Sequence, residues 1–235
     1  MAFNRAMVPI APAGPNALTS AMVGIGMNFA APAASEPNIE DTLLFASVEG
    51  MQNADLRVLA VLVTWFGIHA PYVNADRLTK LVAAEKSDRV RAFWSALARW
   101  QAKDRRFNRL ANVHSGPGVD LLTTGNAFQM RRHGEDARFA GGPLSVPANV
   151  LRDRPADVLP SGRLARRHRA YRWRVIIGPS YRADLWAALE REPSLSTAML
   201  ARKAYGSFAT AWHVRRDFAL LADVTKRALA TKRIK

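Results

Sequence analysis

The 235-residue sequence contains no cysteine. This absence excludes disulfide bonds, thiolate zinc sites and a cysteine nucleophile, and it favours a reducing, cytoplasmic location. The five histidines show no metal-site spacing, so we expect no metal and no cofactor. Long apolar runs are also lacking: the most apolar stretch, Val58 to Gly67, is too short to cross a membrane, and we expect no membrane partner.

Common enzyme signatures are absent as well. The sequence has no Gly-x-Ser-x-Gly, Walker A or Gly-x-Gly-x-x-Gly motif. Gly206-Ser207 with Asp217 downstream has the outline of a nucleotidyltransferase loop, but Phe218 and Ala219 follow Asp217, so the second metal-binding carboxylate is missing. We therefore expect a protein that is not an enzyme. The alternative is a metal-independent RNA endonuclease that uses His168 or His213 and leaves no motif.

Acidic residues are scarce relative to basic ones. The chain has 34 Lys+Arg and 19 Asp+Glu, a formal charge of +15 and a pI near 11.2. Residues 160–235 hold 17 basic and 5 acidic residues, whereas residues 1–159 hold 17 and 14. An excess of this size suits a polyanionic partner, and we expect DNA first and RNA as the alternative. A genome whose base composition favours Arg and Ala is the other explanation of the excess.

The first 37 residues differ in composition from the rest. They are rich in Ala, Pro and Gly, with Arg5 and Glu36 as their only charges. Pro9, Pro12 and Pro15 interrupt the apolar stretch that a signal peptide needs. We expect residues 1–37 to form a flexible arm, or an extension before a later start such as Met27.

Residues 38–133 have the apolar spacing of helices. After a short helix that begins near Asn38, three more are expected, capped by Asn53, Asn74 and Ser87, and these suit a helix-turn-helix core. Two strands could flank Gly116-Pro117-Gly118, which would place a small β-hairpin wing near residues 107–130. We expect this region to be a winged-helix-like N-terminal domain.

Residues 134–162 contain four prolines and no apolar periodicity, so we expect a Pro/Gly-rich linker. A segment of dense arginine with interleaved aromatic residues follows, as phosphate contact and base stacking would require. An ordinary helix whose arginines are solvated at the edge of a core is the alternative. The arginines of this segment are Arg163, Arg166, Arg167, Arg169, Arg172 and Arg174.

The C-terminal domain, expected over residues 163–235, has three more helical patterns. The first two follow Ser180 and Ser196, and the third follows Gly206-Ser207 and places Ala211, Val214, Phe218 and Leu221 on one inward stripe. The last eleven residues form a basic tail. The whole chain is thus expected to be mainly α, with two helix-turn-helix-like units joined by a linker.

Residues 180–224 resemble the helix-turn-helix of winged-helix bacterial regulators, and residues 53–101 resemble it more weakly. Ala201 matches the small residue of the second helix, Gly206-Ser207 the turn, and Ala211 and Val214 the paired inward positions of the recognition helix. Many members place the turn glycine one residue earlier, where this chain has Tyr205. The resemblance implies that the third helix enters a major groove.

On this basis we expect the exposed face of the third helix to contact nucleic acid. His213 and Arg216 would reach base edges or phosphates, while Ser207, Arg202 and Lys203 would hold the backbone. Trp212 and Leu220 on the same face fit a groove poorly and suggest a protein partner or packing within the chain. The nucleic-acid-binding residues of this unit are therefore Arg202, Lys203, Ser207, His213, Arg215 and Arg216.

The function expected from these features is that of a sequence-specific DNA-binding transcriptional regulator. The alternative is a non-catalytic DNA- or RNA-binding subunit of a larger nucleoprotein complex, as in plasmid replication, mobile elements or CRISPR-type defence. An antitoxin-like protein that binds both DNA and a partner protein is a third hypothesis. A homodimer through the N-terminal domain is compatible with each of them.

Overall fold

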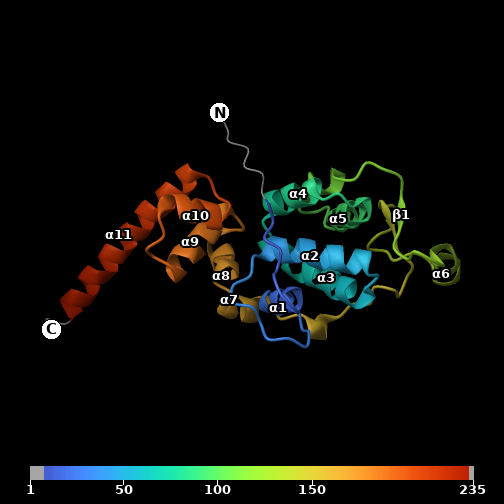
Figure 1. Ribbon diagram of the computed structural model, residues 1–235, viewed down its shortest axis with the longest axis horizontal. Helices are drawn as coiled ribbons and strands as arrows, with labels where there is room; N and C mark the ends of the chain where they lie inside the picture. The colour runs from blue at the N-terminus through green and yellow to red at the C-terminus, as the bar shows by residue number, and fades with distance from the viewer. Residues whose placement is uncertain (1–7, 233–235) are drawn as a thin grey trace. The chain divides into compact units, whose positions relative to one another are not determined.

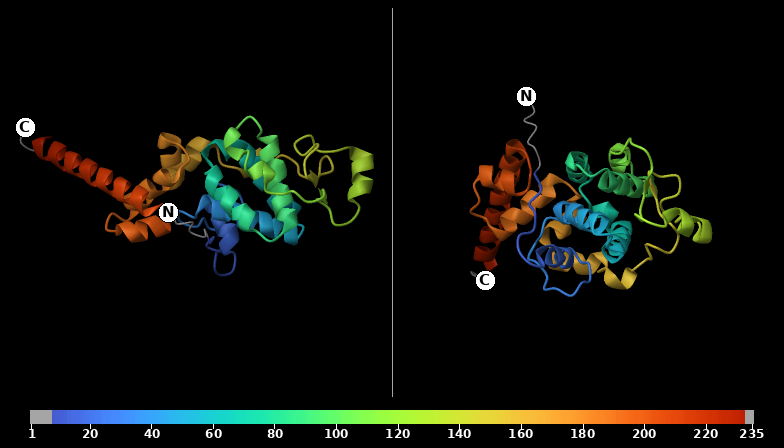
Figure 2. Two further views of the ribbon diagram at one scale, coloured as in Figure 1. Left: turned by 90° about the horizontal axis from the view of Figure 1, so that it is seen from above. Right: turned by 45° about the vertical axis from the view of Figure 1, so that its right-hand side comes forward.

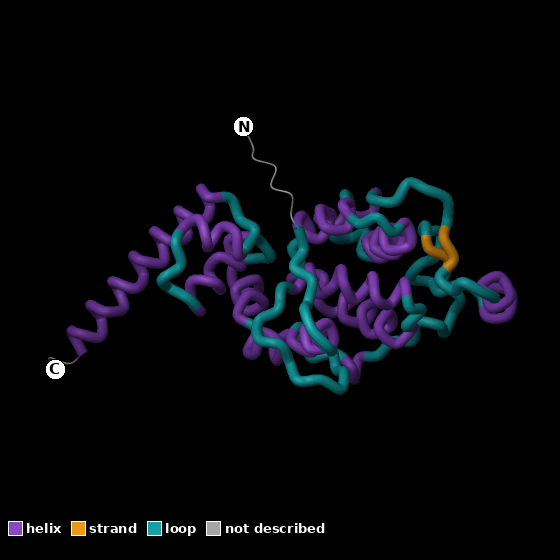
Figure 3. Tube along the Cα trace, in the orientation of Figure 1, coloured by secondary structure: helices purple, strands orange, loops and turns teal. Residues whose placement is uncertain are grey.

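The computed structural model describes residues 8–232 of the backbone and the side chains as far as Leu221. Helices make up most of the described chain, as Figure 3 shows. The chain divides into two compact units, Met1–Arg167 (the N-terminal unit) and His168–Lys235 (the C-terminal unit). The expectation of a mainly α protein is confirmed.

Four helices build the centre of the N-terminal unit: α2 (Ile39–Gln52), α3 (Leu56–His69), α4 (Ala75–Ala84) and α5 (Asp88–Trp100). α2 packs along α3 (Figures 1 and 2), and the aromatic side chains of Phe66, Phe93 and Trp94 are buried. Asn74 and Ser87 cap the helices that follow them, as expected, and Asn38 caps α2 in the same way.

The expected cap at Asn53 was wrong. Asn53 ends α2, Ala54 turns the chain with φ 53°, and the Asp55 carboxylate accepts from the amides of Arg57 and Val58 at the start of α3. A carboxylate satisfies these otherwise unpaired amides as an asparagine side chain would.

Residues 16–37 pack against the rest of the N-terminal unit. α1 (Ala17–Gly24) buries Met22, and Ile25 and Met27 after it are also buried. The Trp65 indole donates to the carbonyl of Ile25 at 2.8 Å, and Met27 forms an isolated bridge with Val158. These residues are therefore not the flexible arm expected from their composition, because the contacts that hold them come from distant parts of the sequence. Residues 1–7 of that arm lie outside the described residues.

The expected hairpin near residues 107–130 is not present. That region consists of η2 (Arg105–Phe107), η3 (Leu110–Asn112), β1 (Val119–Asp120) and the start of α6 (Asn126–His133). β1 pairs in parallel with β2 (Leu144–Ser145), and parallel strands need a crossover, which excludes a hairpin. The Asn126 amide bridges the pair by donating to Asp120 Oδ1 at 2.9 Å and to Ser145 Oγ at 3.0 Å.

Residues 134–162 belong to the N-terminal unit and are not a linker between domains. Phe139, Leu144, Val146 and Leu151 are buried there, followed by η4 (Pro155–Asp157) and α7 (Ser161–Arg167). The division between the units falls after Arg167 instead. Prolines remove helical periodicity, but they do not prevent an irregular segment from covering a core.

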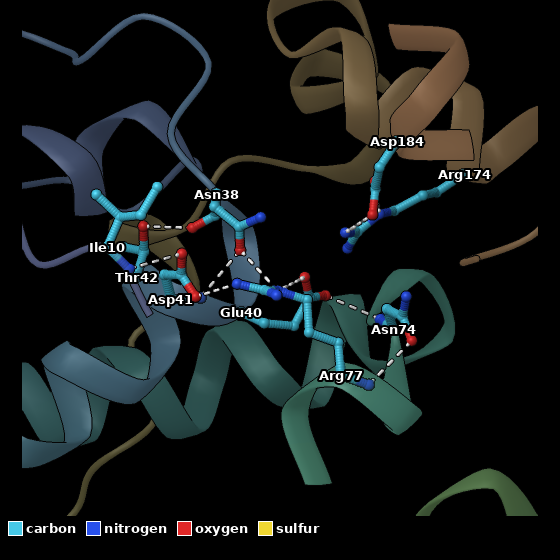
Figure 4. A network of polar contacts seen from close by, with 9 residues as sticks. All are labelled: Ile10, Asn38, Glu40, Asp41, Thr42, Asn74, Arg77, Arg174 and Asp184. Carbon is cyan, nitrogen blue, oxygen red and sulfur yellow. Dashed lines mark hydrogen bonds and ion pairs between the residues drawn. The ribbon is translucent and has the colours of Figure 1, made fainter. Parts of the chain in front are cut away.

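A buried polar network joins α2 to α4 (Figure 4). Arg77 is fully buried; its Nη2 forms an ion pair with Asp41, and its Nε donates to Asn38 Oδ1 at 3.3 Å. Glu40 accepts from the amide of Asn74 at 2.9 Å. A buried charge is tolerated only when paired and hydrogen-bonded, so this network specifies how the two helices meet.

The C-terminal unit contains α8 (Arg169–Ile177), α9 (Tyr181–Arg191), α10 (Thr197–Lys203) and α11 (Phe208–Lys232). Leu185, Leu189, Leu195, Leu200 and Val214 are among the buried side chains of its core. α11 continues well past α9 and α10 (Figure 1). The side chains of the predicted basic tail lie outside the described residues. Within residues 8–232, none of the helices has the length and apolar content needed to cross a membrane.

Candidate nucleic-acid interface

The turn between α10 and α11 is short and well defined. Tyr205 has a left-handed backbone with φ 55°, at the position where many winged-helix regulators have glycine. Gly206 is buried, and a Cβ there would lie 3.1 Å from Leu185 Cδ1. In this chain the glycine therefore suits the close packing on α9, while tyrosine adopts the unusual backbone conformation.

Ser207 begins α11. Its Oγ accepts from the amide of Thr210 at 3.0 Å and shares a hydrogen bond with Thr210 Oγ1 at 2.8 Å. The side chain is exposed and acts as a helix cap, which agrees with the predicted turn and cap. Its position at a helix N-terminus, where backbone amides point outward, is one that anions favour.

The inward stripe of α11 is confirmed over its first three positions. Ala211 and Val214 are fully buried, and Phe218 packs partly buried against the core with its ring 5.6 Å from that of Trp186. Ala201 on α10 is also buried and allows α10 to approach closely. Leu221 was expected on the same stripe but is 56% exposed, because α11 has passed the end of the core by that residue.

The opposite face of α11 carries the side chains predicted to face outward. Trp212, His213 and Arg216 are exposed, and Leu220 is 59% exposed. The Arg216 guanidinium lies over the Trp212 ring, 5.6 Å from its centroid, and the His213 ring meets the Trp212 ring edge to face. The three groups form one cationic and aromatic surface.

Asp217 is held by two arginines. Arg182 on α9 donates to its Oδ2 at 2.8 Å and Arg216 to its Oδ1 at 3.0 Å. The hydrogen bond from Arg182, followed by that from Arg216, lowers the pKa of the Asp217 carboxyl. Arg182 was not among the predicted residues, because its partner lies 35 residues away in sequence.

The remaining predicted residues near this face differ in how they are engaged. Arg202 is exposed at the end of α10. Lys203 next to it forms an ion pair with Glu192, which lowers the pKa of that carboxyl. Arg215 is exposed, and its guanidinium donates to the carbonyl of Leu195 at 2.7 Å. All four cations are exposed, but Lys203 and Arg215 also brace the α9–α10 turn and Arg216 is also paired with Asp217.

The boundary between the units divides the predicted arginine-rich segment. Arg163, Arg166 and Arg167 are exposed on α7 of the N-terminal unit. On α8, Arg169 is partly buried, and Arg172 pairs with Glu190 at 2.6 Å. The helical break between the two groups comes at His168, whose Nδ1 accepts from the amide of Tyr171 and caps α8.

Arg174 does not fit the role of a phosphate contact. Its side chain is 1% exposed and makes two hydrogen bonds to the Asp184 carboxylate (Figure 4), with Nε to Oδ1 at 2.8 Å and Nη2 to Oδ2 at 2.9 Å. The prediction for Arg174 is corrected: it is a structural residue that ties α8 to α9.

Two exposed apolar residues were not predicted: Phe208 was not singled out, and the helical pattern after Ser196 predicts that Met199 faces inward. Phe208 at the start of α11 is 54% exposed, and Met199 on α10 is 56% exposed. Phe208 precedes Trp212 by four residues, which is the helical spacing that places two side chains on one face and could have revealed it. Together with Trp212 and Leu220 they give this surface a substantial apolar component.

Nothing in the described geometry resembles two-metal chemistry around Ser207 and Asp217. Ser207 caps a helix, and Asp217 is bound by arginines. In the part of the chain that the structure describes, no three His, Asp or Glu side chains are grouped so as to hold a metal ion.

The chain was compared with models of protein families, with curated proteins and with solved structures, and none of the three comparisons found a match.

Proposed function

We propose that the protein binds DNA through its C-terminal unit and acts as a sequence-specific transcriptional regulator. The observation that carries the proposal is the exposed face of α11, where Arg216 and His213 stand opposite the buried Ala211 and Val214. α10, the four-residue turn after it and α11 resemble a helix-turn-helix. In that motif the second helix lies in the major groove, and its N-terminal half contacts the bases. No catalytic role is proposed.

The positive charge of the C-terminal unit supports this proposal. Residues 168–235 carry 14 Lys+Arg and 5 Asp+Glu, so the unit that holds α11 has a formal charge of +9. Such an excess attracts a polyanion and releases its counterions on binding. Arg202 and the amides at the Ser207 cap are suited to the phosphate backbone, and Arg216 to a guanine edge.

The experiment is a selection from a random duplex library with the full chain, followed by anisotropy titrations at several salt concentrations. We expect enrichment of one sequence and an affinity that falls steeply with salt, with a slope near −0.9 per phosphate contacted. Equal binding of every duplex would remove the regulator proposal, and absence of binding at low salt would remove nucleic-acid binding altogether.

A second function is favoured by one specific observation. Phe208, Trp212 and Leu220 are about half exposed or more on the face that would enter the groove, and large apolar groups there suit a protein partner. In that case the chain is a non-catalytic subunit of a nucleoprotein assembly. Trp212→Ala then abolishes assembly while leaving the salt-dependent binding of non-specific DNA in place.

A further inference from the structure

The N-terminal unit contains a cavity of about 490 Å³. It opens between the start of α3, the middle of α6 and the irregular segment 149–154, all of which belong to this one unit. Its volume lies in the range of cavities that enclose small molecules, roughly 300 to 1,000 Å³.

Three arginines give the cavity lining a positive charge. They are Arg57, Arg152 and Arg154, and no acidic residue lines the cavity. Within the described residues no carboxylate lies within 4.0 Å of the guanidinium groups of Arg57 and Arg152. Arg154 is paired with Asp157 through Nη1 at 3.2 Å, while its Nε is buried without a hydrogen bond from the described residues. Two positive charges and one donor are therefore available to a ligand.

The segment that carries two of these arginines is firmly held. Arg138 donates to the carbonyl of Leu151 and binds Asp153 at 2.6 Å, and the amide of Arg154 donates to Thr64 Oγ1 at 3.0 Å. Because Asp153 is bound by Arg138, it does not neutralise the adjacent Arg152. The backbone that carries Arg152 and Arg154 is thus held before any ligand arrives, which reduces the ordering cost of binding. The Arg57 guanidinium lies over the Phe29 ring, 5.4 Å from its centroid.

The apolar residues of the lining suit an apolar or planar body. They are Leu56, Ala60, Leu122 and Val150. The amide groups of Gln129 and Asn149 also line the cavity and offer both donors and acceptors.

From this arrangement we infer that the cavity binds a phosphorylated small molecule of about nucleotide size. The phosphate would contact Arg57, Arg152 and Arg154, and the remainder of the molecule would contact the apolar lining residues. A phosphomonoester carries a charge near −2 at neutral pH, which matches two uncompensated arginines, and its oxygens accept the paired donors of guanidinium groups.

The test is calorimetric titration of the full chain with AMP, adenosine and inorganic phosphate. We expect AMP to bind, inorganic phosphate to bind more weakly and adenosine to bind at least tenfold more weakly than AMP. The double variant Arg57→Ala/Arg152→Ala should lose at least tenfold in AMP affinity, since each exposed arginine supplies charge-assisted hydrogen bonds. Arg105→Ala removes an exposed arginine of the same unit outside the cavity and should leave AMP affinity unchanged.

Either of two results would overturn the inference. The first is that neither AMP nor phosphate gives binding heat at millimolar concentration, and the second is that the double variant and Arg105→Ala lose equal AMP affinity. Both altered side chains are exposed, so circular dichroism should give the wild-type spectrum for the double variant. A short oligonucleotide identifies the source of the phosphate: if it alone binds in a manner sensitive to the double variant, the cavity contacts nucleic acid and the small-molecule inference falls. Arg216→Ala, in the other unit, should not affect AMP binding, which keeps this test separate from that of the proposed function.

Discussion

Arg174 and Asp184 form a buried, two-point ion pair between α8 and α9, with distances of 2.8 and 2.9 Å. Five neighbouring arginines, from Arg163 to Arg172, are exposed or only partly buried, so residues of one type in one short segment have two different roles. Removing one partner of a buried pair leaves the other charge desolvated and uncompensated, which costs far more than the pair itself contributes.

We therefore expect Arg174→Ala to lower the free energy of unfolding of the C-terminal unit by about 3–5 kcal/mol. Arg172→Ala is the matched control: its pair with Glu190 is more than one third exposed on both sides, and its loss should cost about 1 kcal/mol or less. Urea unfolding measures the two differences, and hydrogen exchange in α8 and α9 localises them. Equal effects of the two variants would contradict the structural role of Arg174.

A substitution at Gly206 tests how tightly the α10–α11 turn packs on α9. A Cβ at this position would lie 3.1 Å from Leu185 Cδ1 in the core, so Gly206→Ala should destabilise the unit by about 1–3 kcal/mol through overpacking. Gly162 on α7 has no atom within 4 Å of an added Cβ, so Gly162→Ala should be neutral or stabilising by up to about 1 kcal/mol. Thermal unfolding of both variants gives the comparison, and a neutral Gly206→Ala would show that Leu185 can move aside.

The burial of His69 leads us to expect that the protein loses stability in acid. Burial lowers its pKa to about 4, although a hydrogen bond with the carbonyl of Leu159 at 3.0 Å opposes the shift. The pKa of His69 is near 6.5 in the unfolded chain. The stability that the protein gains by burying a neutral His69 is therefore fully present above pH 6.5 and is lost as the pH falls towards 4. The total is about 3 kcal/mol.

The measurement is the free energy of unfolding between pH 7 and pH 4 for the wild type and for His69→Gln, which keeps a donor for Leu159 and does not titrate. The variant should lose less stability than the wild type over this interval. His133→Gln, at an exposed histidine of α6, should retain the wild-type pH dependence. Parallel curves for all three proteins would contradict a neutral, buried His69.

Arg216 and Arg202 should affect DNA binding in different ways. If α11 lies in the major groove, Arg216→Ala should cost about 1–3 kcal/mol on the selected sequence and relax the preference at one base position. Arg202→Ala should weaken binding to all sequences alike and reduce the salt slope by about one phosphate. Anisotropy titrations on the selected and a scrambled duplex measure both, and identical profiles for the two variants would argue against a reading role for Arg216.

Local features of the sequence determined most of the helices. Apolar spacing and capping residues such as Asn74, Ser87 and Ser196 depend on neighbours three or four positions away, and the outward positions of Trp212, His213 and Arg216 follow from the helical period alone. The concentration of positive charge after residue 160 is likewise a property of composition.

The tertiary structure decided what covers each face. Burial of Met27 beside Val158, parallel pairing of β1 with β2, the inclusion of residues 134–162 in the N-terminal unit and the cavity bounded by Arg57 and Arg152 all bring together residues far apart in the chain. A sequence pattern records that a side chain is apolar or charged, but it does not contain its distant partner. For that reason Arg174 could not be distinguished from its exposed neighbours until Asp184 was placed beside it.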